Sequence, residues 1–500
     1  MPSGALLQLV ARGQQDVALY DPPGMSLFTH VYLKPTRFAT ESIQQTVIGD
    51  VSFGKRVVIE LSRAGDLVHD LLLELTLPDL ESVSANRDKV SWIEKIGHYC
   101  IDTVTLEIGG TVVERHTGEW FNVVDQLTRP ASKDRGANRM CGNTPQLTNP
   151  DFVGKQIRGR KLYIPLRFDC CNPDVAAQSL PMVALQYHGI RVTIDFAAQE
   201  KMVVSHSSLY DLIETQIEKL PRNPALSNAI WKNAATMDRN MRNILETIDD
   251  PEIEIQDIRD AVKRVREFSI GEELELQLAV WKNIASTVDG ERWVTAIADR
   301  RQYRLGDNMS GEVYANMVML DNKERTQMAQ MAHDLVIAQV QHQSRIHFGA
   351  GVTKPRIPLV FSHPVKELVI LCHREDQAQP SIYHEEDADG TTMSPFCSVT
   401  LIVNGHERFS PRDGEYYDTF VPTMFHGRSP ENGVHCMCFS LEPASDSISS
   451  TLNFSRIDNA VLVTEFKDGI DRTERTVDVY AVNYNILRIS GGLGGVKFSN

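Results

Sequence analysis

Most of this chain alternates apolar and polar residues with a period of two, the pattern of strands that bury one face. Gly, Pro, Asn and Asp separate the alternating runs. The clearest runs cover residues 71–77, 104–108, 162–168, 190–196, 399–403 and 477–481. Many short strands with turn residues between them predict a mainly β protein, built as a sandwich or a barrel.

One long region breaks this alternation and favours helices. Within residues 205–305, apolar side chains recur at helical spacing, as in Leu209, Ile213 and Ile217. A strand-to-strand connection of this length needs structure of its own, and short helices need packing partners. We therefore expect residues 205–305 to form a mainly helical insertion, folded as a small bundle, within the first β unit.

A second helix is predicted between the two β-rich halves of the chain. Asp321 is suited to cap it, with Glu324 three residues on. Met328, Ala332 and Leu335 keep helical spacing and are expected to pack against a β unit. The pattern predicts a linker helix over residues 321–345.

The stretch GDVSFGKR, residues 49–56, resembles a nucleotide-binding loop. Such a loop needs a hydroxyl after its Lys and a helix behind it, so that backbone N–H groups face the phosphates. Here Arg56 takes the hydroxyl position, and Val57, Ile59 and Leu61 alternate as in a strand. The glycines are therefore interpreted as the turn before a strand.

Charge and composition restrict the partners. The formal net charge of the 500 residues is −15, a balance that repels phosphate backbones, so no direct nucleic-acid binding is expected. No apolar run approaches a membrane span, and no secretory signal is seen at the N-terminus. The eight cysteines form no Cys-x-x-Cys pair and are expected to be reduced.

Candidate chemistry is sparse. No two of the 15 histidines stand two, three or four residues apart, and no Gly-x-Ser-x-Gly occurs. HCMC, residues 435–438, places Cys436 and Cys438 on one strand face and His435 on the other, which favours packing thiols over a local metal site. EEDADG, residues 385–390, lacks the glutamate of a calcium loop. No catalytic, cofactor-binding or metal residue is predicted, and a metal cluster assembled from distant residues stays open.

Several stretches, in this order, resemble the major capsid proteins of nucleocytoplasmic large double-stranded DNA viruses. They include GALLQLVARGQQDVALY near the start, FATESIQQTVIGDVSFGKRVVIELSRAGDLV, WIEKIGHYCIDTVTLEIGG, GEWFNVVDQLT, HPVKELVIL, and VYAVNYNILRISGGLGGVKFSN at the end. The segment FDCCNPDVAAQSLP and residues 205–305 depart from the family pattern.

This resemblance implies two tandem eight-stranded antiparallel jelly rolls joined by a helix. The expected divisions are an N-terminal arm (1–24), a first jelly roll (25–320) with the insertion 205–305, the linker helix (321–345) and a second jelly roll (346–500). It also implies a structural, non-enzymatic protein of the virion shell, assembled in the host cytoplasm. Three chains would form a pseudo-hexagonal capsomer that contacts neighbouring capsomers, minor capsid and penton proteins, near an inner membrane, without cofactor or small-molecule substrate.

Two other functions fit a jelly roll, because fold alone does not decide function. A cellular β-sandwich carbohydrate-binding protein would be a small oligomer whose melting responds to sugar. A minor capsid protein of the same viruses is the third possibility, and a jelly-roll enzyme ranks below these because its ligands are absent from the sequence pattern.

Overall fold

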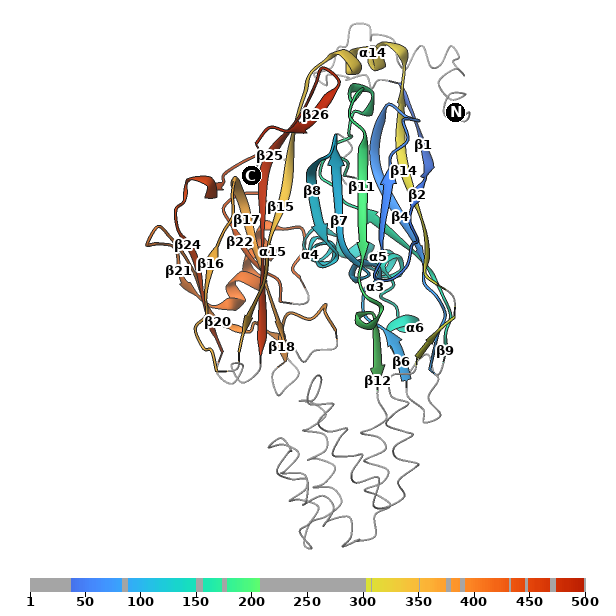
Figure 1. Ribbon diagram of the computed structural model, residues 1–500. Coiled ribbons are helices and arrows are strands. Elements are labelled where there is room, and N and C mark those ends of the chain that lie inside the picture. The colour runs from blue at the N-terminus through green and yellow to red at the C-terminus, as the bar shows by residue number, and fades with distance from the viewer. Residues whose placement is uncertain are drawn as a thin grey trace, which may run out of the picture.

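The computed structural model describes most of the chain outside its N-terminus and the central region. The described residues are 37–82, 89–149, 156–172, 178–206, 303–306, 308–349, 351–374, 379–386, 392–430, 433–445, 448–467 and 474–498. They form two β-sandwiches that stand side by side (Figure 1). In this part of the chain, no helix has the length and apolar character needed to cross a bilayer.

The first sandwich is made of two facing antiparallel sheets. One sheet has the order β1 (Phe38–Gln45), β14 (Ser310–Leu320), β4 (Leu67–Thr76) and β10 (Lys161–Leu166). The other has the order β2 (Val47–Ile48), β3 (Arg56–Glu60), β11 (Ile190–Phe196), β7 (Ile101–Ile108) and β8 (Thr111–Thr117). The leucines at 71, 73 and 75 point into the space between the sheets and are buried, as their alternation predicted.

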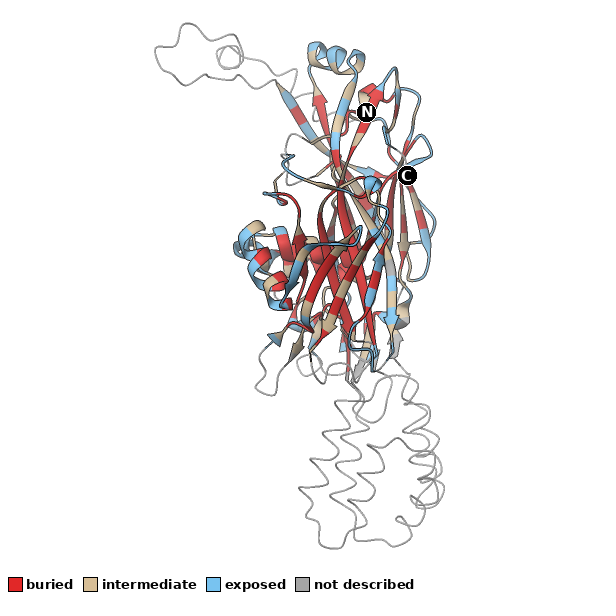
Figure 2. Ribbon diagram, turned by 90° about the vertical axis from the view of Figure 1, so that its left-hand side faces the viewer, coloured by how far each residue is buried: buried red, intermediate tan, exposed pale blue. Residues whose placement is uncertain are grey.

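The second sandwich also consists of two antiparallel sheets. One has the order β15 (His333–Phe348), β25 (Arg475–Ser490), β17 (Pro364–Arg374) and β22 (His435–Cys438). The facing sheet has the order β16 (Arg356–Leu359), β24 (Ala460–Phe466), β20 (Phe396–Val403) and β21 (His406–Arg412). Each sandwich has its own cluster of buried hydrophobic side chains. Many strand residues are coloured as buried in Figure 2.

The two sandwiches repeat one topology. When only the eight main strands of each unit are counted and the short strands are left out, each unit has one sheet in which the first, eighth, third and sixth strands are neighbours, and a second sheet with the second, seventh, fourth and fifth. This strand order is that of a jelly roll, in which the chain passes repeatedly between the facing sheets. The mainly β, two-unit architecture predicted from the alternating pattern is confirmed.

Short elements complete the described structure. The helices are α3 (Ile96–Tyr99), α4 (Gly118–Thr128), α5 (Asp134–Cys141), α6 (Pro145–Thr148), α14 (Asn322–Gln330) and α15 (Val421–Phe425), the last preceded by a π-helical turn at Tyr416–Phe420. The short strands are β5 (Leu80–Ser82), β6 (Lys89–Trp92), β9 (Gln156–Ile157), β12 (Val203–His206), β13 (Tyr303–Leu305), β18 (Glu385–Glu386), β19 (Thr392–Met393), β23 (Leu452–Asn453) and β26 (Leu493–Val496). 3-10 turns cover Ala131–Lys133, Met182–Ala184, Gln199–Lys201 and Phe454–Arg456.

The stretch that resembled a nucleotide-binding loop is a turn before a strand, as interpreted. Gly49 and Gly54 adopt positive φ angles of 111° and 71°, which favour glycine, and β3 starts at Arg56. Lys55 forms an exposed ion pair with Asp50, 2.9 Å away. No helix begins behind these N–H groups, so the arrangement that holds a phosphate is missing from this described segment.

The predicted linker helix is too long. The N-cap is correct, since the Asp321 carboxylate accepts from the N–H of Asn322, but α14 ends at Gln330 and β15 begins at His333. The second sandwich therefore starts before residue 346. None of the α14 residues is buried, and Leu335 lies half-buried in a strand.

The physical reason lies in the partner strand. β15 pairs with β25 from His333 opposite Ile489 to Phe348 opposite Arg475, and this long ladder outweighs the helical spacing of its apolar residues. Charge holds α14 in place, because the Arg325 guanidinium lies 2.9 Å from the buried Asp66 carboxylate. Figure 2 shows the helix largely exposed.

Two further predictions concern residues mostly outside the described ranges. The N-terminal arm, 1–24, lies outside them entirely, as do residues 207–302 of the insertion. At the margins of the insertion the structure has strands: β12 pairs with β6, and β13 pairs with β5. The bounds of the predicted insertion were therefore too wide, because residues 205–206 and 303–305 are strand; the prediction that it is mainly helical concerns residues outside the described ranges.

The strands β15 and β25 belong to both units. Each is 16 residues long, and the two pair along their length. Ile337, Leu487 and Ile489 at one end of the pair are buried in the core of the first sandwich. Val477 and Val479 at the other end are buried in the core of the second. The paired strands β15 and β25 therefore run without a break from the core of one unit into the core of the other.

Shortening the Ile337 side chain tests whether β15 contributes to the core of the first sandwich. Ile337→Val is expected to lower the free energy of unfolding by about 0.5–1.5 kcal/mol, because it removes a methyl group from the first core. The neighbouring Val336 is exposed, so Val336→Thr is the matched control, with a change within about 0.5 kcal/mol. Chemical unfolding of both variants measures the difference. Equal effects would show that Ile337 is not packed there.

Candidate functional site at the junction of the two sandwiches

Helix α4 lies between the two sandwiches (Figure 1). It starts directly after β8, where the Thr117 hydroxyl caps it by accepting from the Trp120 N–H at 3.2 Å. Phe121 packs in the first core, whereas Trp120, Val123 and Leu127 pack in the second. Each unit therefore buries one part of helix α4.

The start of α4 requires glycine. A Cβ at Gly118 would lie 2.2 Å from the carbonyl oxygens of His98 and Ile101. Because these are backbone atoms, any larger residue at position 118 would force the backbone to shift. This close approach fixes the helix against the first sandwich. It explains why GEWFNVVDQLT begins with glycine although the residue is poor in helices.

Beside α4, a buried charge network joins the units. Glu119 of the helix accepts a hydrogen bond from the Tyr480 hydroxyl at 2.7 Å. Its other carboxylate oxygen lies 2.7 Å from His373 Nε2, an ion pair that is poorly aligned for a hydrogen bond. His373 is also 3.5 Å from the Asp478 carboxylate. Strands β17 and β25 of the second sandwich thereby contact the helix of the first.

Asp478 is the centre of the network. Its side chain is 0% exposed and faces three cationic or titratable groups: His342 at 2.8 Å, Arg345 at 3.2 Å and His373. The His342 ring also stacks on Tyr480 with 4.4 Å between centroids. A buried carboxylate is tolerable only when it is paired in this way.

Within the network, the surroundings shift the pKa values of Glu119 and Tyr480. Burial alone raises the pKa of Glu119, but His373, the Tyr480 hydroxyl and Arg345 bring that pKa below its ordinary value. Burial, with the carboxylates of Glu119 and Asp478 nearby, raises the pKa of Tyr480, so its hydroxyl remains a donor. The arrangement suits a permanent joint better than proton transfer.

A second polar bridge crosses the junction at Tyr383. The Tyr99 and Tyr383 hydroxyls lie 2.8 Å apart, and the Asn122 amide donates to both, at 3.0 and 3.1 Å. Tyr99 also donates to the carbonyl of Pro380 at 3.1 Å. Because these groups are buried and paired, they fix the relative position of the two sandwiches.

The two units also border a cavity of about 520 Å³ that is open to solvent. Trp120, Phe121 and Arg167 line it from the first sandwich, and Val340, Glu367 and His426 from the second. Within the described residues, two trios bring potential metal ligands within 4.8 Å of one another: Glu119 with His373 and Asp478, and Glu367 with His426 and Cys438.

Of these residues only Cys438 was considered from the sequence, as a packing thiol, and none was grouped with the other members of its trio. Consecutive members of each trio are separated by 12 to 254 positions in the chain, so local spacing could not unite them. Asp478 lies on the polar face of an alternating strand, a face expected to meet solvent, yet the sandwich beside it buries that face. The only signal was Glu119 in the otherwise apolar start of α4.

Comparison with known families was made over the whole sequence. Residues 26–235 match the family described as "Major capsid protein N-terminus". Residues 324–495 match the family described as "Large eukaryotic DNA virus major capsid protein". The two matches fall on the two sandwiches and together span most of the chain.

Individual relatives agree over full length. The major capsid protein of Phaeocystis pouchetii virus is 27% identical, with 100% of both chains covered. That of Paramecium bursaria Chlorella virus 1 is 26% identical, again with 100% of both covered. A quasi-atomic structure of the capsid of the latter virus superposes with a TM-score of 0.62 at 23% identity, covering 95% of this chain and 100% of the other. This likeness shows the shared fold.

Proposed function

The chain belongs to the major capsid proteins of large eukaryotic DNA viruses, and we propose that three copies associate into one capsomer of pseudo-hexagonal outline. As a major capsid protein it assembles with other capsid subunits into the virion shell. The trimer is the step by which a chain with two like units becomes a six-sided building block.

The observation that carries this proposal is the repeated topology. Two sandwiches with the same strand order stand side by side in each chain. A three-fold arrangement of such chains places six similar sandwiches around one axis, and six-sided blocks tile a flat lattice. The junction described above supports the idea, because only a rigid pair of sandwiches gives every capsomer the same outline.

Further partners follow from the same proposal. We assign the arm, residues 1–24, to contacts with minor capsid proteins or neighbouring trimers at the inner face, near an internal membrane. Penton proteins would close the shell where six-sided blocks cannot. The insertion would form an outward cap on the capsomer, and assembly would take place in the host cytoplasm.

The role is structural and not enzymatic. The carboxylates of the charge network at the junction are engaged in ion pairs, and the stretch at Lys55 is a strand turn. With a net charge of −15, the chain would not bind nucleic acid directly, and the proposed function needs neither cofactor nor small-molecule substrate.

Sedimentation equilibrium of the purified full chain tests the trimer. We expect a single species with three times the mass of the chain, at protein concentrations in the micromolar range. The two domain cores predict that isolated chains are folded, so trimers and monomers are both measurable states. A monomer that persists on concentration, or a dimer, would contradict the proposal.

A further inference from the structure

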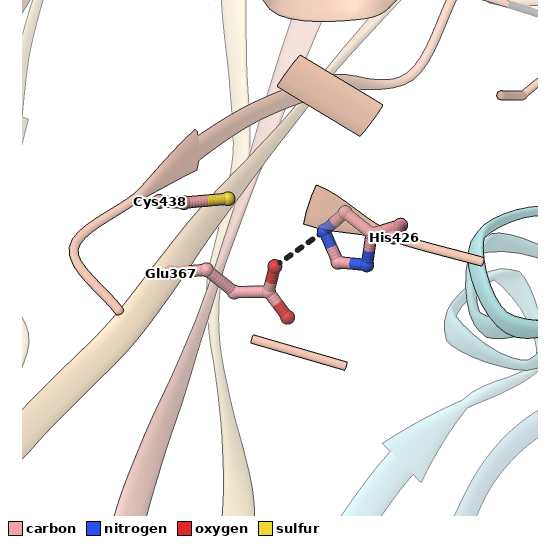
Figure 3. Close-up of side chains that lie close together, drawn as sticks. All are labelled: Glu367, His426 and Cys438. Atoms are coloured by element: carbon pink, nitrogen blue, oxygen red, sulfur yellow. Dashed lines mark ion pairs between the residues drawn. The ribbon is translucent and has the colours of Figure 1, made fainter. Parts of the chain in front are cut away.

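Glu367, His426 and Cys438 lie where the second sandwich meets the cavity, and their side chains converge on one point (Figure 3). Glu367 on β17 and Cys438 on β22 are directly opposite each other in the strand ladder, so both side chains leave the same face of the sheet. His426 follows α15 and lies over that face. Three different segments thus supply one oxygen, one nitrogen and one sulfur.

The environment of His426 lacks the partners that a buried imidazole normally has. Its side chain is only 2% exposed, yet neither ring nitrogen has a hydrogen-bond partner. Nε2 lies 2.9 Å from a Glu367 carboxylate oxygen that is itself without a hydrogen bond. Nε2 and this oxygen form an ion pair without a well-formed hydrogen bond, and Nδ1 has no partner. Buried polar groups without good hydrogen bonds cost free energy, and a bound ion would take the place of the pair and coordinate both atoms.

We propose that these three side chains bind a divalent transition-metal ion of the zinc class, with water from the cavity as fourth ligand. Thiolate and imidazole ligands select zinc over calcium or magnesium, which prefer oxygen. The three ligand atoms lie within 4.8 Å of one another. Around tetrahedral zinc they would be about 3.3–3.8 Å apart, so shifts of about 1 Å or less complete the site.

The other trio is a weaker candidate for the same ion. Glu119, His373 and Asp478 already face Arg345 and His342, whose positive charges would oppose a cation. The Lys366 charge also acts on Glu367 and Cys438, but its ammonium donates a hydrogen bond to the Pro443 carbonyl, 2.8 Å away. Fewer positive side chains therefore face this trio than face the other.

The metal would add a link between the segment that follows α15 and two strands of the second sandwich. Two residues after His426, the Arg428 guanidinium pairs with Asp134 of the first sandwich. An ion at His426 would therefore fasten this bridging segment to β17 and β22. The proposed role is a clamp at the junction, independent of whether chains form trimers.

Cobalt(II) binding to the metal-free full chain, kept reduced, tests the site. We expect one ion per chain and a thiolate-to-cobalt charge-transfer band in the near ultraviolet. Cys438→Ser should abolish the band and His426→Gln should abolish stoichiometric binding. The matched control is Cys397→Ser, which removes an exposed thiol and should leave the band unchanged.

X-ray absorption of the zinc-loaded wild-type chain gives an answer that needs no variant. The expected result is one sulfur at about 2.3 Å with nitrogen or oxygen ligands at about 2.0–2.2 Å. A wild-type chain without the cobalt band, a band that survives Cys438→Ser, a band lost in Cys397→Ser, or zinc without a sulfur ligand would each overturn the proposal.

Discussion

Asp478→Ala is expected to lower the free energy of unfolding by about 1–3 kcal/mol, because it takes one carboxylate partner from the nearly buried His373 and removes the contacts of the partly exposed His342 and Arg345. The Asp478 side chain is 0% exposed, and its carboxylate lies within 3.5 Å of His342, Arg345 and His373. Its loss removes the centre of the network that holds α4 against the second sandwich. Chemical unfolding monitored by circular dichroism and by tryptophan fluorescence measures the loss, since Trp120 lies at the junction.

The matched control lies on the same pair of strands. Asp334 on β15 pairs with Arg488 on β25 through two contacts of 2.7 and 2.6 Å, but both side chains are about half exposed. Water screens such a pair, so Asp334→Ala should leave the unfolding free energy nearly unchanged. If both variants lose equal stability, the buried network does not hold the junction.

Acid is expected to destabilise the protein through its buried histidines. Burial lowers the pKa of His435 to about 3 and that of His98 to about 4. An unfolded histidine titrates near about 6.5, so the unfolded chain takes up protons that the folded chain refuses. This stability is complete above pH 6.5 and is lost as pH falls toward 4, at about 3 kcal/mol for each histidine.

Two sets of carboxyl groups also change the unfolding free energy as pH falls. Burial raises the pKa of Asp418 to about 6, which works in the opposite direction and offsets about 3 kcal/mol between pH 6 and 4. The pKa values of Glu119 and Glu367 are lowered, so their contributions are lost only below about pH 4.3. Subtracting the unfolding free energy of a variant from that of the wild type at each pH cancels the contributions of these carboxyl groups.

His435→Gln isolates the histidine contribution. Between pH 7 and pH 4 the variant should lose about 3 kcal/mol less unfolding free energy than the wild type, because glutamine does not titrate. His406 is exposed on β21, so His406→Gln should keep the wild-type profile. Chemical unfolding at a series of pH values measures the curves. Parallel curves for wild type and His435→Gln would refute this origin of acid sensitivity.

Alternation predicted the architecture because a sandwich strand buries one face. The runs at 71–77, 162–168 and 190–196 all proved to be strands whose apolar residues fill the first core. The same reasoning failed for residues 331–345, where Leu335, Val336 and Gln339 fit a helix as well as a strand. Only the long partner β25, more than a hundred residues away, decides that segment.

The junction was hidden from the sequence for a related reason. β25 is buried on both faces, since Val477 and Val479 face the interior of its own sandwich while Asp478 and Tyr480 face the first. A pattern that normally marks one solvent-facing side here marks an interface between units. Likewise, the strand with Cys436 and Cys438 was expected to hold packing thiols, and Cys438 meets Glu367 and His426 only through tertiary structure.

Electron cryo-microscopy of the purified capsomer tests the central claim most directly, namely that each chain supplies two rigidly joined jelly rolls to one six-sided block. The account predicts, in projections along the three-fold axis, six β-rich lobes of similar size in a pseudo-hexagonal outline, with constant spacing within each chain's pair. Particles with three lobes, or pairs whose two lobes vary in relative position from one particle to the next, would contradict it.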